Sequence, residues 1–394
     1  MATLDAIFGQ DAAVSWLRSA VSAGRLPHGL LFSGPAGVGK GTTALALAGL
    51  LLCRQPRTTP ALDRCGRCDS CVLLDAETHP DYRRVYRQLI RLEKDAKARD
   101  LSVDVIRDHL LIPASRTSQL GRGKVFVVEE AERMSRAAQN ALLKTLEEPA
   151  PDTVIVLLTD TPGALLPTVR SRCQPLWFRP LPDELMLAEL ERRGVPRATA
   201  ESAVRLADGS LGTALRYVED DLLPLIDELQ RQVTATLARR PGATAVGGTA
   251  GGGGGAGAAA GGGLLKFLKE AGERLADKAM QRDPDGSKDQ ATREALAELT
   301  RLAENGLRRL LRSARSAAGL ERLCGGIEAL VQARDDLESN VAVGLVLNSL
   351  VAQLETAGET SFPGMAPASG TVAAAGPASA GGAAETVRPP ASRG

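Results

Sequence analysis

The stretch from Leu30 to Thr43 constrains the fold more than any other part of the chain, because an apolar run leads directly into closely spaced glycines and a lysine. Its sequence is Leu-Leu-Phe-Ser-Gly-Pro-Ala-Gly-Val-Gly-Lys-Gly-Thr-Thr. This order predicts a buried strand, a P-loop and a helix, with backbone N–H groups and a helix N-terminus turned toward a phosphate. The residues expected to bind the phosphates of a nucleotide are Gly34, Gly37, Gly39, Lys40, Gly41 and Thr42.

One position of this loop departs from the usual pattern, which places Ser or Thr directly after the lysine so that a hydroxyl reaches Mg²⁺. This chain has Gly41 there, and hydroxyls follow only at Thr42 and Thr43. A shift of one residue rotates a side chain by about 100° around a helix. The loop therefore favours binding over hydrolysis, and whether ATP with magnesium is bound stays open.

A second apolar run, from Lys124 to Val128, ends in Glu129 and Glu130. In P-loop ATPases such a strand ends in an Asp that holds Mg²⁺ and a Glu that polarises water. In this chain Glu129 stands at the position of that Asp, and it is one methylene longer, which disturbs the metal geometry. Because the metal site is weakened, Glu130, at the position of the water-polarising Glu, is expected to have a weak or vestigial catalytic role. A simpler interpretation of both acids is the preference of a helix N-terminus for negative charge.

The order of the elements predicts the fold class. A third apolar run, from Thr153 to Leu158, places Thr159 beside the P-loop as a further nucleotide-binding residue, since parallel sheets gather their sites at the carboxyl ends of strands. Strands alternating with helices indicate an α/β doubly wound parallel sheet. The regions 182–219 and 264–354 show only helical periodicity, which adds all-α parts to the fold.

This pattern divides the chain into successive segments. Residues 5–23 are predicted as a first helix, and 103–111 as another. The predicted organisation is an α/β domain at 1–180 with a cysteine module inserted at 53–71, a helical lid at 181–219, a connecting helix at 220–240, a Gly/Ala-rich linker at 241–263, a C-terminal helical domain at 264–356 and a disordered tail at 357–394.

Four cysteines form the pattern C-x11-C-x2-C-x2-C after the P-loop helix. Four thiolates without a nearby histidine suit tetrahedral zinc, and because every position is filled the metal would be structural. An iron–sulfur cluster of ferredoxin type would want a further cysteine at position 75, which is Asp75. Free thiols in a basic loop are the alternative interpretation. The predicted zinc ligands are Cys53, Cys65, Cys68 and Cys71.

Composition limits the classes of partner. The formal net charge is +1 and aromatic residues make up 3% of the chain, so a contact with DNA must be local or made through partners. The N-terminus lacks a signal-peptide pattern, and no apolar run reaches the roughly 18 residues of a membrane span. We expect a cytoplasmic protein without a membrane partner.

A P-loop, an acidic strand end, a threonine-bearing strand and three lid helices together resemble an AAA+ ATPase module. Two phrases, Asn140-Ala-Leu-Leu-Lys-Thr-Leu-Glu-Glu-Pro149 and Leu166-Pro-Thr-Val-Arg-Ser-Arg-Cys173, together with the four-cysteine insert, are similar to bacterial DNA polymerase III clamp-loader subunits. The likeness covers residues 1 to about 219. The motifs resemble the delta-prime type more than the gamma/tau motor type, because Gly41 and Glu129 depart from the motor pattern and Gly212 stands where motor subunits place an arginine.

The resemblance implies that the chain is a stator in a hetero-pentameric ring with gamma/tau and delta subunits. This ring opens the sliding clamp and loads it onto primed DNA. The resemblance also implies that Arg172 reaches the ATP site of a neighbouring motor subunit as a trans-acting finger, that the C-terminal helices form a collar, and that the ring belongs to the nucleoid-associated replication machinery. Polymerase chemistry is not expected on this chain, and its own ATPase activity is expected to be weak or absent.

Three alternatives remain at this point. A gamma/tau-like motor subunit would hydrolyse ATP by itself. A nucleoside monophosphate kinase shares the Gly-Lys-Gly-Thr loop, but it would place that loop almost at the N-terminus. A zinc-stabilised scaffold would bind no nucleotide. ATP turnover and the binding of an ATP analogue distinguish these functions.

Overall fold

A five-stranded sheet with the order β2-β3-β4-β1-β5 organises the N-terminal half of the protein. The computed structural model describes residues 2–89, 100–238, 260–282, 287–339 and 341–357. Every pairing in the sheet is parallel, which confirms the predicted fold class. The strands are β1 (Gly29–Ser33), β2 (Tyr82–Val85), β3 (Lys124–Val128), β4 (Thr153–Thr159) and β5 (Gln174–Trp177).

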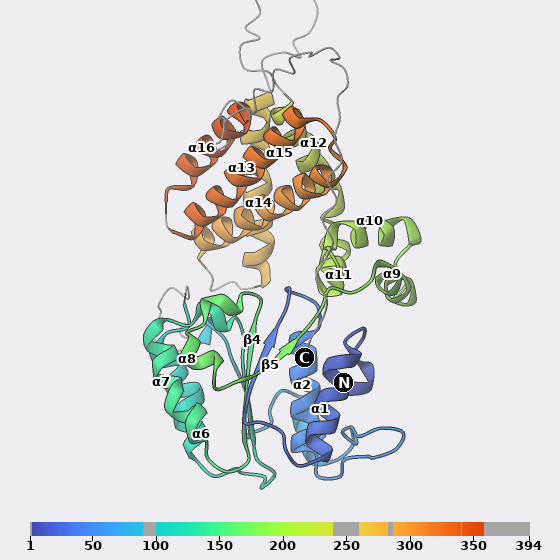
Figure 1. The fold of residues 1–394 in the computed structure, drawn as a ribbon, viewed down its shortest axis with the longest axis vertical. Coiled ribbons are helices and arrows are strands. Elements are labelled where there is room, and N and C mark those ends of the chain that lie inside the picture. The colour runs from blue at the N-terminus through green and yellow to red at the C-terminus, as the bar shows by residue number, and fades with distance from the viewer. Residues whose placement is uncertain (1, 90–99, 239–259, 283–286, 340, 358–394) are drawn as a thin grey trace, which may run out of the picture.

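Helices cover both faces of this sheet (Figure 1). Neighbouring residues of one strand enter different cores, because side chains alternate between the two faces. In β1, Leu31 packs in one core, while Leu30 and Phe32 pack in the other. Burial on both faces explains why the central strands are continuous apolar runs. The covering elements are α1 (Asp11–Ser22) and α2 (Lys40–Leu52) on one face, and α5 (Val103–Ile106), η2 (Arg107–Leu111), α6 (Ile112–Ser115), α7 (Arg136–Glu147) and α8 (Pro167–Arg170) on the other.

Two predicted helices differ from the structure. The helix expected at 5–23 is divided into η1 (Leu4–Ala6) and α1, because Gly9 lies between them with a φ of 66° that no helix contains. The helix expected at 103–111 continues through a π turn, η2, to Ser115. Short 3-10 turns η3 (Ala131–Arg133) and η4 (Pro162–Ala164) follow β3 and β4, and α3 (Asp69–Asp75) begins directly after Cys68 and contains Cys71.

The second half is helical throughout its described residues. The lid helices are α9 (Asp183–Arg192), α10 (Arg197–Ala207) and α11 (Leu211–Glu219), followed by α12 (Leu223–Leu237). The C-terminal helices are α13 (Ala260–Arg282), α14 (Lys288–Ser313), α15 (Ala317–Glu338) and α16 (Val343–Thr356). Positions 241–259 of the expected linker and 358–394 of the expected tail lie outside the described residues. Positions 260–263, also expected in the linker, belong to the start of α13.

The lid and the C-terminal helices share one hydrophobic core, which runs from Leu181 through α12 to Leu354. Tyr217 of α11, Ile226 of α12 and Leu299 of α14 are all buried in it. The lid is therefore joined to the C-terminal helices by side-chain packing and not by the linker alone. None of the described helices is long and apolar enough to cross a membrane.

Candidate functional site

The P-loop connects β1 to α2 at the carboxyl edge of the sheet. Gly37 and Gly39 have φ values of 73° and 104°, a region that favours glycine. Gly37 also lies against the lid, since a Cβ there would approach the Ser210 Oγ to 2.3 Å. Gly34 packs against the backbone of Phe178 and is not among the residues that line the cavity described next.

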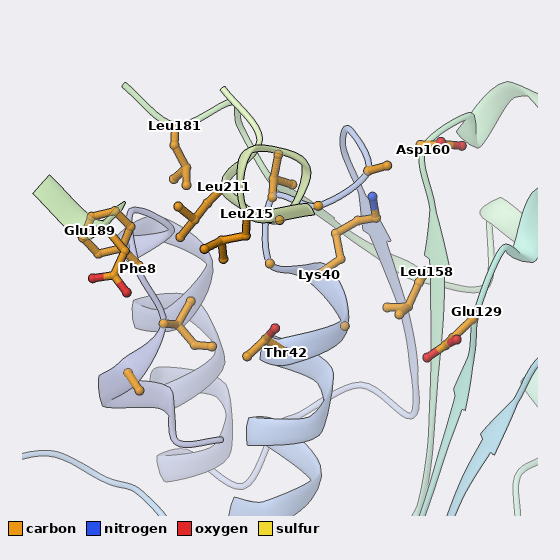
Figure 2. A pocket seen from close by; sticks show the side chains of 18 of the residues that line it. Phe8, Lys40, Thr42, Glu129, Leu158, Asp160, Leu181, Glu189, Leu211 and Leu215 are labelled. Carbon is orange, nitrogen blue, oxygen red and sulfur yellow. The ribbon is translucent and has the colours of Figure 1, made fainter. Parts of the chain in front are cut away.

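A cavity of about 750 Å³ opens between the P-loop, the ends of β3 and β4, and the lid. This volume is within the usual range for small-molecule sites, roughly 300–1,000 Å³. Figure 2 shows Phe8, Leu181, Leu211 and Leu215 toward one end of the cavity, and Lys40 toward the other. The predicted nucleotide-site residues that line it are Gly37, Gly39, Lys40, Gly41, Thr42, Glu129, Glu130 and Thr159.

Lys40 and one of the two threonines that follow it are held by hydrogen bonds to the loop. The Lys40 Nζ donates to the carbonyl oxygens of Gly34 and Pro35, with 2.7 Å to Pro35. Burial lowers the pKa of Lys40, and the nearby Asp160 opposes this shift. The Thr43 hydroxyl donates to the Gly39 carbonyl oxygen at 2.8 Å, so it is turned back onto the helix. Only Thr42 therefore offers a hydroxyl at the cavity from the start of α2.

The two acids at the end of β3 are both paired with arginines. The Arg84 Nε donates to the Glu129 Oε1 at 2.9 Å, and the Arg87 Nε lies 2.9 Å from the Glu130 Oε2. The pairing follows from topology, because β2 runs beside β3 with Arg84 opposite Val127. Both carboxylates thus have cationic partners in the place where an ATPase would use them for Mg²⁺ and water.

Arg87 also connects the sheet to the C-terminal helices. Its Nη1 donates to the Glu294 Oε1 of α14 at 2.9 Å, and its side chain is only 15% exposed. Glu130 itself has a φ of 48°, which is uncommon for a residue with a side chain. The acid expected to act on water is therefore part of an ion-pair bridge between the two halves of the chain.

Further charged groups line the cavity, and two of them, Glu132 and Glu189, were not predicted from the sequence. Glu132 and Asp160 lie near Lys40, and burial raises the pKa of Glu132 although the Thr159 hydroxyl opposes this. On the lid side, hydrogen bonds from Arg192 and Arg193 lower the pKa of Glu189 to about 2. These residues belong to a 3-10 turn, a strand end and a lid helix, for which the sequence has no fixed spacing.

The lid contacts the P-loop at Gly212, the position that resembles an emptied arginine site. The Gly212 N–H donates to the Gly37 carbonyl oxygen at 2.9 Å, and a Cβ at Gly212 would lie 3.0 Å from the Gly37 Cα. The position is consequently filled by the backbone of the P-loop. A side chain at 212 requires the lid and loop to separate.

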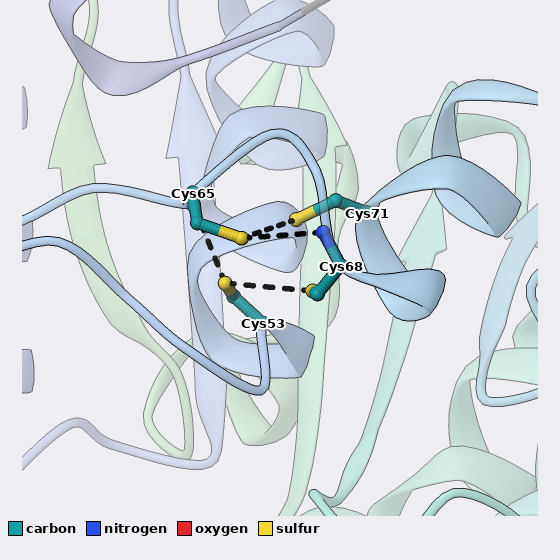
Figure 3. Close-up of side chains that lie close together, drawn as sticks. All are labelled: Cys53, Cys65, Cys68 and Cys71. Atoms are coloured by element: carbon teal, nitrogen blue, oxygen red, sulfur yellow. Dashed lines mark hydrogen bonds between the residues drawn. The ribbon is translucent and has the colours of Figure 1, made fainter.

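The four predicted zinc ligands lie together, as Figure 3 shows. Their sulfur atoms are all within 4.8 Å of one another, with 3.9 Å from Cys53 to Cys68 and 4.0 Å from Cys65 to Cys71. Zinc–sulfur bonds of about 2.3 Å place tetrahedral sulfurs roughly 3.8 Å apart. The cluster is thus compatible with a structural zinc site.

Local structure explains how the cysteines meet. Cys53 follows the last turn of α2, while Cys68 and Cys71 begin α3. Backbone N–H groups of Cys65 and Cys68 point at the sulfurs of Cys53 and Cys65, at 3.3 and 3.4 Å. Burial opposes the ionisation of Cys68, yet backbone hydrogen bonds lower its pKa to about 6. The thiolate that a metal requires is thus favoured at Cys68, whereas burial raises the pKa of Cys53 and Cys71.

Arg172 lies outside the cavity, just after α8. Its Nε donates to the Glu147 Oε1 at 2.7 Å, its Nη1 donates to the Thr168 carbonyl oxygen at 2.9 Å, and its side chain is 34% exposed. The neighbouring Cys173 is buried, which raises the pKa of its thiol to about 12. The guanidinium is therefore at the surface and is held in place by its own chain.

Comparisons with known proteins agree with the motifs. Residues 9–182 match the family described as DNA polymerase III, delta subunit. The DNA polymerase III subunit delta' of Pseudomonas aeruginosa is 38% identical over 221 residues, which are 54% of this chain and 64% of the relative. The delta' subunit of Escherichia coli is 36% identical over 214 residues, 52% of this chain and 61% of the relative. These matched segments span less than two thirds of each relative.

More distant similarities extend to the gamma/tau subunits. The DNA polymerase III subunit gamma/tau of Mycobacterium tuberculosis is 38% identical over 186 residues, 47% of this chain and 30% of the relative. A crystal structure of a gamma subunit-related protein from Thermotoga maritima covers 87% of this chain and 99% of its own, with 16% identity and a TM-score of 0.42. Over its α/β half, the chain is therefore similar to DNA polymerase III delta' subunits and, over a shorter stretch, to gamma/tau subunits.

Proposed function

We propose that this chain is a stator subunit of the DNA polymerase III clamp loader, which acts with gamma/tau and delta partners to place the sliding clamp on primed DNA in the cytoplasm. Similarity to delta' subunits over the α/β half supports this role and leaves the kinase alternative without support. The observation that carries the stator assignment is the pairing of Glu129 with Arg84 and of Glu130 with Arg87.

These ion pairs oppose ATP hydrolysis on this chain. A carboxylate that is paired with a guanidinium must lose that partner before it can bind Mg²⁺ or a water nucleophile, and Gly41 supplies no hydroxyl to the metal. The cavity and the P-loop still offer space and N–H groups for phosphates. We therefore propose that the site, if it takes a nucleotide, holds it without turnover.

Arg172 is proposed to act on a neighbouring subunit's ATP. A guanidinium stabilises the charge that spreads over the oxygens of a transferring phosphoryl group. The Arg172 side chain is near the surface, and its partner Glu147 is 48% exposed. Exposed ion pairs contribute little energy, about 0–1 kcal/mol, so a phosphate could replace Glu147 at small cost.

The four cysteines are proposed to hold one structural zinc. When bound, the metal would fix the segment between α2 and α3, whose shape depends on the cysteines at both of its ends. With all four positions occupied by thiolates, no position is left for water, and the site is not expected to take part in hydrolysis.

ATP hydrolysis measured in two settings tests the function. The purified chain alone should show negligible turnover, and adding it to motor and delta subunits with clamp and primed DNA should increase DNA-dependent hydrolysis and clamp loading. A robust rate from the lone chain that Lys40→Ala abolishes would identify it as a motor instead. No effect on the assembled partners would contradict the clamp-loader role.

A further inference from the structure

Arg64, directly before Cys65, is the largest of the fully buried side chains in the described residues, with 1% of its surface exposed. A fully buried arginine is unusual, because removing its charge from water is costly unless partners replace the lost hydration. The stem of Arg64 crosses α2 at Gly49, where a Cβ would lie 2.7 Å from the Arg64 Cδ. The fold thus makes room for this side chain beside the cysteine cluster.

The guanidinium is only partly satisfied by neutral and carboxylate acceptors. Its Nη2 contacts the Asp75 carboxylate and the Cys71 carbonyl oxygen, the latter at 3.4 Å. Its Nε and Nη1 are buried, and neither has an acceptor among the described residues. Two N–H groups without acceptors destabilise a folded protein unless another negative group lies close by.

The cysteine cluster supplies such a negative group when it holds a metal. Zn²⁺ with four thiolates has a net charge of about −2, and Cys53 and Cys71 are buried. Arg64 directly precedes Cys65, and its Nη2 lies 3.4 Å from the carbonyl oxygen of Cys71, so the guanidinium is next to two of the four ligand residues. A buried positive charge beside this buried negative cluster can offset part of the cost of burying each charge.

We propose that Arg64 is the buried counter-ion of the four-cysteine metal site, held in position by Asp75, and that metal loading is therefore coupled to this arginine. The inference rests on the proposed zinc binding, to which it adds a residue that is not a ligand. An arginine that merely bridges α2 and α3 would stabilise the chain equally with and without metal. A counter-ion stabilises the chain only when the cluster is negatively charged, and metal binding brings this about because it deprotonates the thiols.

Zinc affinity of the full chain tests the coupling. Arg64→Met keeps the length of the side chain and removes its charge, and it should weaken zinc binding by about 10–100-fold, as losses around a metal site do. Arg67→Met is the matched control, because Arg67 lies in the same loop but is exposed. Its effect should be less than about threefold, since water screens an exposed charge. Competition with a chromophoric chelator measures both.

Thermal unfolding with zinc and with excess chelator distinguishes a counter-ion from a bridge. Arg64→Met should lower the Tm of the zinc-loaded chain, but leave the Tm of the metal-free chain unchanged or raise it, because the unsatisfied N–H groups are removed. Equal losses in both states, or misfolding in both, would overturn the proposal in favour of a structural bridge. Arg64→Lys should recover part of the zinc affinity, and a lysine variant as weak as the methionine variant would also contradict it. If the unaltered chain binds no zinc, the metal site itself is wrong.

Discussion

At the scale of single residues, arginines in β2 and just after it change what the two acids that follow β3 can do. Glu129 and Glu130 are where an ATPase would hold Mg²⁺ and polarise water, but Arg84 and Arg87 occupy them instead. The Arg84–Glu129 pair is partly exposed, with 45% and 31% of the two side chains accessible. Its contribution is therefore modest, and a metal can compete with it.

Arg84→Ala should free Glu129 and strengthen magnesium-dependent binding of a fluorescent ATP analogue by about two- to fivefold, the equivalent of one partly exposed ion pair. Hydrolysis should stay negligible, because Gly41 still supplies no hydroxyl. Arg83→Ala is the control, since Arg83 is exposed on the same strand and has no ion pair among those described. Equal affinities of the Arg84 and Arg83 variants would show that the pairing does not restrain Glu129.

Some residues of the site could be predicted from the sequence, and others could not. The P-loop glycines and the four cysteines follow fixed local spacings, and the structure brings the cysteines together as predicted. Arg84 and Arg87 have no such spacing to Glu129 and Glu130. Their meeting depends on β2 lying beside β3, which follows from strand order in three dimensions.

At the scale of elements, strands were predictable because buried apolar runs have sharp ends. The predicted run at 124–128 has the same bounds as β3, and the run at 153–158 is one residue shorter than β4. Helices were less predictable where the backbone changes without a change of polarity. Gly9 interrupts one predicted helix, and a π turn prolongs another, although the apolar stripe continues in both cases.

The contact between α11 and the P-loop could not be predicted from sequence patterns either, because it joins segments that are far apart in the chain. Gly212→Arg should destabilise the protein by about 1–3 kcal/mol, as overpacking does, since its Cβ would press on Gly37. It should not create ATPase activity, because the acids of β3 remain paired. Chemical denaturation and an ATPase assay measure the two effects.

Gly344→Ala is the control for the change at Gly212, because Gly344 is also a glycine in a helix, α16, but nothing lies within 4 Å of a Cβ at this position. This replacement should leave stability unchanged or raise it by about 0.5–1 kcal/mol, from the better helix propensity of alanine. If Gly212→Arg is as stable as the unaltered chain, the lid does not rest on the P-loop in solution.

At the scale of the whole molecule, two contacts among the described residues help to hold the C-terminal helices to the lid and to the α/β half. One is the hydrophobic core that the lid shares with α12 through α16, and the other is the Arg87 bridge from Glu130 to Glu294. Figure 1 shows the C-terminal helices above the edge of the sheet where the strands end, with the lid helices α9, α10 and α11 to one side. A change at the acids of β3 can therefore reach α14 through a single arginine.

The proposed function of Arg172 also belongs to this scale, because its substrate is on another subunit. Arg172→Ala should leave the chain folded, zinc-loaded and able to join its partners, since the residue is at the surface and its bond to Glu147 is partly exposed. Fingers of this kind contribute on the order of 10³-fold in phosphoryl transfer, but one site among several in a ring dilutes the effect. DNA-dependent ATP hydrolysis and clamp loading should fall, while complex formation measured by gel filtration stays the same.

Arg172→Lys should not restore the rate, because an ammonium lacks the planar fork. Arg170→Ala, a change of the exposed arginine two residues earlier, is the control. If the Arg172→Ala and Arg170→Ala complexes load clamps equally fast at limiting ATP, Arg172 has no role in trans.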